Sequence, residues 1–396
     1  MSTFLGCIEE IPGISVDRFD GEKHLRSSAY FLSHCHTDHM KGLNNDFFRF
    51  LSQKKKYLYC SPISKAFLLN KYNFYEDHIE TYVKEINVDQ KVLIAYKNET
   101  DLCIYVTCIS AGHCPGSVMF LFEKNDEVIL YTGDFRINSR DYKKIAPLHV
   151  CNEFGVFPKK LTKLYLDTTF LDPNFASFPS RKECINVMCK VVTDWLEKSP
   201  RNVVVLECSA LYGSEFLYKE LSISMNTRIH IKDYVYNSYC RISDLAHHIT
   251  NDPLSTRIHA CTDKSKGSDL KCRDNVSKDN ILTIVPSVMK WKGKDTSVIG
   301  KWDNCKEKMF NVCYATHASF DELKKFIQYF NPNSIHACVC KEHEKLRVYD
   351  VLNKIQNEVR TDNKDNTCEK YTLQILKHEK IKKKLTDFYL SNTDDS

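Results

Sequence analysis

The sequence predicts an α/β fold in which short buried strands end at metal-ligating side chains. Apolar runs of strand length recur along the chain, for example at residues 29–32, 128–131 and 203–206. A capping box at residues 180–183 opens a stretch with apolar residues at helical spacing, which predicts an amphipathic helix. Histidine or aspartate stands close behind several of the strands. Together these observations indicate a sheet scaffold that carries a metal site.

Length and composition agree with a folded chain of several domains. The 396 residues suffice for two or three domains, and 42% hydrophobic with 12% aromatic residues supports sizeable cores. The net charge of +5 arises from intermixed basic and acidic residues. This balance is compatible with a polyanionic partner such as nucleic acid but does not require one.

The cysteines predict buried thiols in a reducing intracellular compartment. Many of the 18 cysteines lie inside apolar runs, such as those at residues 102–104 and 107–109, and no signal peptide follows Met1. No apolar run approaches the length of a membrane span, so we expect no membrane association.

The most informative motif is the run H-x-H-x-D-H that follows the strand at residues 29–32. Residues two apart on a strand face the same side, so His34 and His36 can bind one metal ion. After a turn, Asp38 and His39 can face a second ion. This density of imidazole and carboxylate groups suits zinc. A solvated histidine cluster is the alternative, but so many ligating residues have little use in packing.

Other strands end in similar chemistry. His113 lies among small residues at 110–117, Asp134 follows a strand and a glycine, and Asp167 ends the strand at residues 164–167. Each signal is weak alone, but their repetition at strand ends strengthens the metal-site prediction. Asp17 ends a short strand, where a surface turn and an orienting role for a ligand are about equally plausible.

These motifs resemble the metallo-β-lactamase-fold nucleases of the β-CASP group, over nearly the whole chain up to about residue 355. The resemblance implies a four-layer αββα sandwich made from both ends of the chain, with an inserted α/β β-CASP domain. The expected divisions are 1–156 and 307–385 for the sandwich, 157–306 for the insert and 386–396 for a polar tail. The residues that carry the resemblance are 15–20, 30–36, 38–43, 111–122, 131–136 and 166–170.

The resemblance also implies a role for each candidate residue at the active site. Zinc is expected at one or both metal positions, with magnesium or manganese as the alternative at the second. His317, which precedes a helix with N-cap Ser319, is the expected final metal ligand. Asp17 and Asp167 would orient ligands. The expected ligands are His34, His36 and His113 for one ion, Asp38, His39 and His317 for the other, and Asp134 as the bridge.

A second cysteine–histidine set predicts a closed structural zinc site in the insert. His230 joins His259, Cys261 and Cys272, and the last three read H-x-C-x10-C. His259 and Cys261 share one face of a strand expected at residues 257–261. The alternative is that these are packing residues.

A rival set has similar chemistry but a different setting. Its members lie around an apolar strand at residues 335–339, which favours plain packing. The set comprises His336, Cys338, Cys340 and His343.

The resemblance implies a nuclear, zinc-dependent DNA endonuclease that opens hairpins and trims overhangs and strand junctions. Its expected setting is double-strand break repair by non-homologous end joining, with V(D)J-type hairpin opening where that exists. DNA is the expected partner. The DNA-dependent protein kinase catalytic subunit and DNA ligase IV are expected too, although the tail that would bind them is absent or cut short here.

Several alternatives remain at the level of sequence. Exonuclease relatives used in cross-link repair carry lysine where this chain has Ser214, and this difference weakens a terminal-phosphate pocket and favours an endonuclease. RNA-processing relatives share the same site. Hydrolysis of small esters or lactams is disfavoured by the insert, and a non-catalytic scaffold by the intact ligand set. A basic stretch at residues 290–308, with Trp291 and Trp302, is either a nucleic-acid contact or a solvated face.

Overall fold

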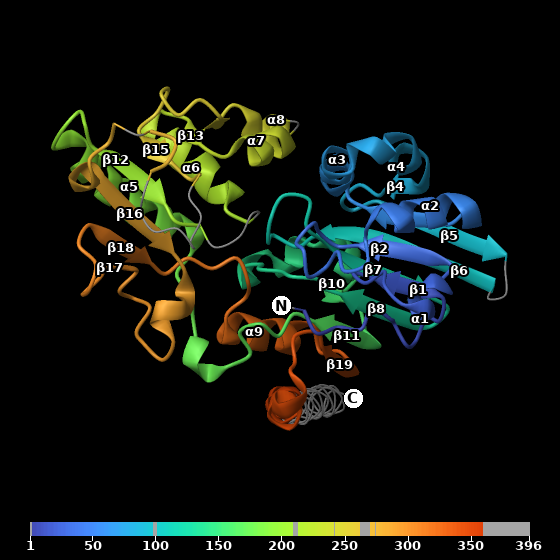
Figure 1. Cartoon of the computed structure of the whole chain (residues 1–396). Coiled ribbons are helices and arrows are strands. Elements are labelled where there is room, and N and C mark those ends of the chain that lie inside the picture. Colours follow the sequence, from blue (N-terminus) through green and yellow to red (C-terminus); the bar gives the residue numbers. More distant parts are fainter. Residues whose placement is uncertain are drawn as a thin grey trace, which may run out of the picture.

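The computed structural model describes residues 2–97, 101–208, 213–240, 242–261, 270–273 and 275–358. The chain forms two lobes, one built on a pair of facing sheets and the other on a single larger sheet (Figure 1). Segments from both ends of the chain build the first lobe, because a strand near residue 335 completes a sheet started before residue 100. This is the arrangement that the resemblance implied.

One sheet of the first lobe contains four parallel strands. Their order in the sheet follows their order in the chain, and Phe31 pairs with Val16 on one side and Tyr59 on the other. Short apolar segments of this kind form strands because branched and aromatic side chains pack well on a pleated surface. The strands are β1 (Ile14–Val16), β2 (Ala29–Leu32), β3 (Tyr57–Cys60) and β4 (Val83–Glu85).

The second sheet of this lobe has six strands in the order β19-β11-β8-β7-β6-β5. The four strands from β5 to β8 form an antiparallel meander, whereas β8, β11 and β19 run parallel. The strands are β5 (Lys91–Lys97), β6 (Asp101–Ser110), β7 (Val118–Lys124), β8 (Glu127–Tyr131), β11 (Lys163–Leu166) and β19 (Ser334–Ala337).

Helices cover the outer faces of both sheets and complete four layers. Between the sheets, Phe31 meets Phe120 and Phe122 with ring centroids 5.3 and 5.0 Å apart. Outside the four-stranded sheet lie α2 (Asn45–Lys54), α3 (Pro62–Lys71) and α4 (Glu76–Tyr82). Outside the six-stranded sheet lie α9 (Phe320–Phe330) and a helix at residues 345–358. The predicted αββα sandwich is therefore confirmed.

The second lobe is built on a seven-stranded sheet in the order β14-β13-β15-β12-β16-β18-β17. All of its strands run parallel except β17, which pairs antiparallel with β18 at the edge. The strands are β12 (Val203–Leu206), β13 (Ile229–His230), β14 (Ile249–Thr250), β15 (Ile258–His259), β16 (Ile281–Pro286), β17 (Gly300–Trp302) and β18 (Met309–Val312).

The longest helix of this lobe begins where the sequence predicts. The helix α5 opens with the expected capping box, in which Ser180 and Glu183 bond to each other's backbone N–H groups. It then buries the predicted apolar stripe, including Met188 and Val192. The helices of the lobe are α5 (Arg181–Glu197), α6 (Glu215–Met225), α7 (Asp233–Tyr239) and α8 (Ser243–Ala246).

The insert begins and ends later in the chain than predicted. Its expected start at residue 157 precedes β11, which belongs to the six-stranded sheet of the sandwich. Its expected end at residue 306 precedes β18, which pairs with β16 in the sheet of the insert. An apolar run identifies a strand but does not reveal which sheet the strand joins. The predicted tail at residues 386–396 lies outside the described residues.

Shorter elements connect these layers. Among the described residues, no helix combines the length and the apolar character that crossing a membrane requires. A short helix, α1 (Glu22–Leu25), lies near the N-terminus. The strands β9 (His149–Asn152) and β10 (Gly155–Pro158) form a hairpin. The 3-10 helices in the described part of the chain are η1 (Asn73–Tyr75), η2 (Ser139–Lys144), η3 (Ala146–Leu148), η4 (Pro173–Phe175), η6 (Lys278–Asn280), η7 (Val288–Trp291) and η8 (Glu342–Glu344).

Candidate metal centres

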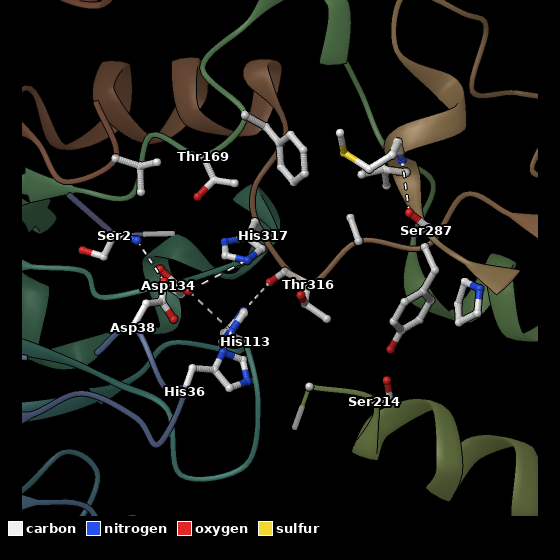
Figure 2. A pocket seen from close by; sticks show the side chains of 18 residues that line it. Ser2, His36, Asp38, His113, Asp134, Thr169, Ser214, Ser287, Thr316 and His317 are labelled. Atoms are coloured by element: carbon white, nitrogen blue, oxygen red, sulfur yellow. Dashed lines mark hydrogen bonds and ion pairs between the residues drawn. The ribbon is translucent and has the colours of Figure 1, made fainter. Parts of the chain in front are cut away.

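The predicted active-site ligands come from separate segments of the chain. Five of them line one cleft: His36, Asp38, His113, Asp134 and His317 (Figure 2). The H-x-H-x-D-H run follows β2, His113 follows β6, Asp134 follows β8 and Asp167 follows β11. His317 comes from the segment between β18 and α9. The sheets place most of these side chains together because they follow strand ends, whereas His317 comes from the segment that leads into α9.

Asp134 lies at the centre of this group. Its Oδ2 atom is 3.6 Å from His34 Nε2, 3.7 Å from His113 Nε2 and 3.8 Å from His317 Nε2. Its Oδ1 atom is 3.3 Å from His39 Nε2. One carboxylate therefore faces four imidazole nitrogens, as a ligand that bridges two metal ions would.

The other predicted ligands lie around this centre. His36 Nδ1 is 3.1 Å from His113 Nε2, and ligand atoms of these two residues, His34 and Asp134 lie within 4.8 Å of one another. Asp38 Oδ2 is 3.9 Å from His39 Nε2. The structure thus brings together all seven residues that the resemblance names as ligands.

The chemistry of this donor set fits metal ions. The Nε2 atoms of His34, His36 and His39 are buried and have no hydrogen-bond partner among the described residues. A buried polar atom without a partner destabilises a fold unless a ligand completes it. Carboxylate oxygen and imidazole nitrogen are ligands that zinc and related ions accept.

Burial and the carboxylates set the charges of the histidines. Burial lowers the pKa of His36 to about 3 and holds the pKa of His113 well below its ordinary value, so both rings are neutral. At His39 burial has the same tendency, but the charges of Asp134 and Asp17 outweigh it and raise its pKa. Burial alone would raise the pKa of Asp134, yet the adjacent histidines, led by His39 and His317, hold it low.

Two carboxylates that are not among the seven predicted ligands contact histidines that are. Asp17 Oδ2 is 2.7 Å from His39 Nδ1, and Asp167 Oδ2 is 2.8 Å from His317 Nδ1. A carboxylate at Nδ1 favours the tautomer that leaves the Nε2 lone pair free for a metal ion. Asp17 is buried, which excludes the surface-turn alternative for this residue.

The structure adds contacts that the sequence did not predict. The backbone N–H of Ser2 donates to Asp38 Oδ2 at 2.9 Å, and His113 Nδ1 lies 3.1 Å from the carbonyl oxygen of Thr316. Nothing in the local sequence marks Ser2, because its position depends on how the first residues pack against distant strands. The local sequence does not predict the contact of the Thr316 carbonyl either, although its position one residue before His317 is a weak indication of it.

The cleft above this centre lies between the two lobes and has a cavity volume of about 260 Å³. The sandwich contributes His36, Asp134 and His317 to its lining, and the insert contributes Ser214 and Ser287 (Figure 2). Residues of both lobes therefore line the space next to the metal ligands.

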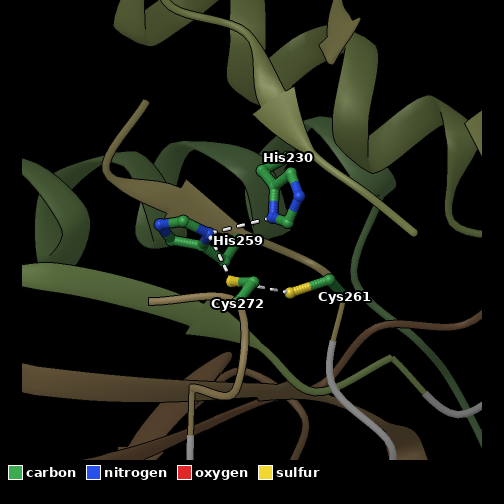
Figure 3. A group of neighbouring side chains, drawn as sticks. All are labelled: His230, His259, Cys261 and Cys272. Atoms are coloured by element: carbon green, nitrogen blue, oxygen red, sulfur yellow. Dashed lines mark hydrogen bonds between the residues drawn. The ribbon is translucent and has the colours of Figure 1, made fainter. Parts of the chain in front are cut away.

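The second predicted cluster assembles in the insert (Figure 3). His230 and His259 pair across β13 and β15, and their Nδ1 atoms are 3.0 Å apart. Cys272 Sγ is 3.4 Å from Cys261 Sγ and 3.5 Å from His259 Nδ1. Two nitrogens and two sulfurs at these separations suit a closed tetrahedral site. The strand expected at residues 257–261 is shorter than predicted, since β15 covers only Ile258–His259.

The rival cluster near the end of the chain has packing contacts instead. The ring of His336 lies 4.9 Å from the ring of Tyr165 and 5.6 Å from that of Phe4, and Cys338 is buried. Its members do not form one of the metal-ligating groups found among the described residues.

Comparison with known proteins agrees with this geometry. The family described as DNA repair metallo-beta-lactamase matches residues 243–343. The chain is 37% identical to Artemis of Mus musculus over 348 residues, which cover 85% of this chain and 48% of the relative. It is 38% identical to Artemis of Homo sapiens over 345 residues, which cover 84% of this chain and 48% of the relative.

A more distant relative shares the same region. The DNA cross-link repair 1A protein of Mus musculus is 27% identical over 334 residues, covering 82% of this chain and 29% of the relative. The chain spans about half the length of the Artemis relatives that it matches. The sandwich, the insert and the clustered ligands agree with this likeness to the Artemis proteins and to the DNA repair metallo-β-lactamase family.

Proposed function

We propose that this protein is a zinc-dependent DNA endonuclease that hydrolyses phosphodiester bonds at hairpins, overhangs and junctions of single-stranded and double-stranded DNA. The observation that carries the proposal is the convergence of four imidazole nitrogens on Asp134 at a cleft between two lobes. The likeness to Artemis and to a DNA cross-link repair protein supports DNA as the substrate.

The ligands divide into two sets. His34, His36 and His113 would hold one ion, Asp38, His39 and His317 the other, and Asp134 would bridge them. Bound zinc ions lower the pKa of water and stabilise negative charge on a phosphoryl group. The carboxylates of Asp38 and Asp134 also suit magnesium or manganese, which remain candidates for the second position.

The surrounding residues would keep the histidine ligands in the tautomer and protonation state that metal binding requires. Asp17 and Asp167 would hold His39 and His317 in the tautomer that directs Nε2 inward. The low pKa values of His36 and His113, caused by burial, keep their lone pairs available without the loss of a proton.

The biological setting follows from the relatives as a proposal. We place the protein in the nucleus, in double-strand break repair by non-homologous end joining and in V(D)J-type hairpin opening where that exists. The DNA-dependent protein kinase catalytic subunit and DNA ligase IV are the proposed protein partners.

An exonuclease that reads a terminal 5′-phosphate is the second candidate, and the entrance of α6 argues against it. A helix N-terminus offers backbone N–H groups to a phosphate. Here the N–H of Gly213 already donates to the carboxylate of Glu215 at 2.8 Å, and Ser214 stands at the N-cap where exonuclease relatives carry lysine. Without that lysine, the N-terminus of α6 offers a weaker pocket for a terminal phosphate.

The first prediction is metal-dependent cleavage that fails when a ligand is lost. His36→Ala and Asp38→Ala should abolish cleavage of a labelled DNA hairpin with the fold intact, because each removes a metal ligand. His247→Ala, which changes an exposed histidine beside α8, is the matched control and should cleave normally. The measurements are cleavage rate, bound metal and circular dichroism.

The substrate panel separates the alternatives. It contains a closed hairpin, linear DNA with a 5′-phosphate or a 5′-hydroxyl, and RNA of the same sequence. Strict dependence on a 5′-phosphate would identify an exonuclease, and preference for RNA would identify an RNA-processing enzyme. Full metal occupancy without cleavage of any substrate would indicate a scaffold.

A further inference from the structure

Tyr314 carries a hydroxyl group that the proposed ligand set does not use. The residue follows β18 and begins the segment that leads to His317. Its side chain is 7% exposed and lines the active-site cleft. Its hydroxyl has no hydrogen-bond partner among the described residues. A buried hydroxyl in this state destabilises the fold, so its presence requires a reason.

Several polar groups near Tyr314 or in the same cavity have hydrogen bonds to other partners. Arg181, whose positive charge acts on Tyr314, donates to the carbonyl oxygen of Gly112 at 2.5 Å. The carboxylate of Glu215 accepts from the N–H of Gly213 and from Tyr239. The Oγ atom of Ser287 accepts from the N–H of Met289 at 3.3 Å.

Tyr314 lines the same cavity as the metal ligands. Tyr314, Gly213 and Ser214 line the same cavity as His36 and Asp134. Gly213 lies so close to the metal centre that a Cβ atom added to it would be 3.7 Å from His36 Nε2. A nucleic-acid strand with a phosphate at Asp134 would therefore pass this wall of the insert.

We propose that the Tyr314 hydroxyl donates a hydrogen bond to a non-bridging oxygen of a substrate phosphate adjacent to the scissile phosphodiester. This assignment rests on the proposed nuclease function and adds a substrate-binding residue to it. Hydroxyl-bearing side chains are common donors to backbone phosphates, and such contacts fix the register of the strand. Burial raises the pKa of Tyr314 above its ordinary value, so the group stays a neutral donor across the physiological range.

The test is Tyr314→Phe, which keeps the ring and removes only the oxygen. If the hydroxyl serves the substrate, the variant should be as stable as the natural chain or more stable, because an unpartnered buried group is lost. The kcat/KM for hairpin cleavage should fall about tenfold or more, with a rise in KM, since a bond to a charged oxygen is lost.

Tyr142→Phe is the matched control. Tyr142 is 2% exposed, and its hydroxyl donates to the carbonyl oxygen of Glu322 at 3.3 Å, away from the residues that line the cleft. Loss of this partnered hydroxyl should lower the melting temperature and leave KM unchanged. The two variants should therefore differ in both measurements: Tyr314→Phe raises KM without loss of stability, and Tyr142→Phe loses stability without a change in KM.

Modified DNA then identifies the contacted phosphate. A methylphosphonate placed at each phosphate next to the cleavage site removes one charged oxygen at a time. At the contacted phosphate, natural protein should lose as much kcat/KM as Tyr314→Phe does, and the variant should lose little more, because both changes remove the same bond.

Three outcomes would overturn the assignment. One is unchanged kcat/KM in Tyr314→Phe while the natural chain cleaves DNA, which would leave the nuclease function standing. Another is lower activity together with a lower melting temperature or metal content, which would make the role structural. The third is absence of cleavage by the metal-loaded natural chain, which would remove the nuclease function and this assignment together.

Discussion

Asp17 combines an unusual backbone with a fully occupied side chain. Its φ angle of 56° lies in the left-handed region, which asparagine and aspartate tolerate better than most residues. Its carboxylate accepts bonds from the N–H of Ser33 at 2.7 Å, the hydroxyl of Ser33 at 2.5 Å and the hydroxyl of Tyr131 at 2.8 Å. The same carboxylate contacts His39, so one side chain links three strands to a candidate ligand.

Asp17→Asn tests this side chain without disturbing the backbone, because asparagine also tolerates the left-handed conformation. The change removes a buried charge from its partners, and we expect a loss of about 3–5 kcal/mol of stability in the metal-free protein. Metal affinity should fall by about 10–100-fold. Chemical denaturation and metal titration measure both effects, and Asp141→Asn, at a more exposed ion pair, is the control. Metal affinity equal to that of the natural chain would contradict the orienting role.

At the scale of single residues, the sequence identifies metal-ligating side chains more readily than it predicts the contacts that a side chain makes in the fold. The histidines of the H-x-H-x-D-H run are visible because metal ligands follow local spacing. The orphan hydroxyl of Tyr314 is invisible, because an apolar strand end with a tyrosine is ordinary in a core. Whether such a hydroxyl finds a partner depends on residues from other elements, here Arg181 and Glu215.

The N-terminal segment, residues 2–4, contacts both the metal centre and the residues that follow β19 at the edge of the six-stranded sheet. The N–H of Thr3 donates to the carbonyl oxygen of Cys338 at 2.9 Å, and the N–H of Cys340 donates to Thr3 Oγ1 at 2.8 Å. Phe4 packs its ring 5.3 Å from that of Tyr131 and 5.4 Å from that of Tyr165. These contacts position the N–H of Ser2 at Asp38.

Phe4→Ala should therefore affect both stability and the metal centre. Loss of a buried aromatic side chain costs about 3–5 kcal/mol, and a loosened segment would withdraw the N–H of Ser2 from Asp38. Thermal melting and metal titration are the measurements. Leu5→Ala serves as the control, because that side chain is 67% exposed and its loss should change little. If Phe4→Ala melts at the same temperature as the natural chain, the N-terminal segment does not stabilise the fold.

Elements themselves follow from the sequence more readily than their partners do. The capping boxes at Ser180 and Ser319 predict the starts of α5 and α9, because both bonds of a capping box are local. The pairing of β18 with β16 is not local, so the end of the insert was predicted too early. Strand pairing depends on contacts across the fold, which a single sequence does not display.

At the scale of the whole molecule, the two lobes contribute different parts of the cleft. The sandwich gathers the candidate ligands at its strand ends, and the insert supplies the facing wall of the cleft. The cysteine–histidine cluster lies within the insert, on β13, on β15 and the residues just after it, and on the segment at residues 270–273. It packs beside a small core formed by Val203, Val205, Leu270 and Ile281. We therefore expect this cluster to stabilise the insert and to act on catalysis only through the shape of the cleft.

Cys272→Ser separates the two metal centres. A closed site of two cysteines and two histidines holds its metal for structure, and its binding energy is folding energy. The variant should lose about one zinc ion per chain and melt at a lower temperature, because a site with four ligands loses one. Turnover in the fraction that remains folded should fall much less than in His36→Ala.

Cys340→Ser is the matched control for this prediction. It changes a cysteine of the rival set, which has packing contacts and should leave zinc content unchanged. Elemental analysis, thermal melting and hairpin cleavage on the same preparations compare the variants directly. If Cys272→Ser keeps its zinc and its melting temperature, then His230, His259, Cys261 and Cys272 pack the insert without a metal ion. If Cys340→Ser instead loses zinc, the structural site lies beside β19, and the lobe that the metal stabilises is the sandwich.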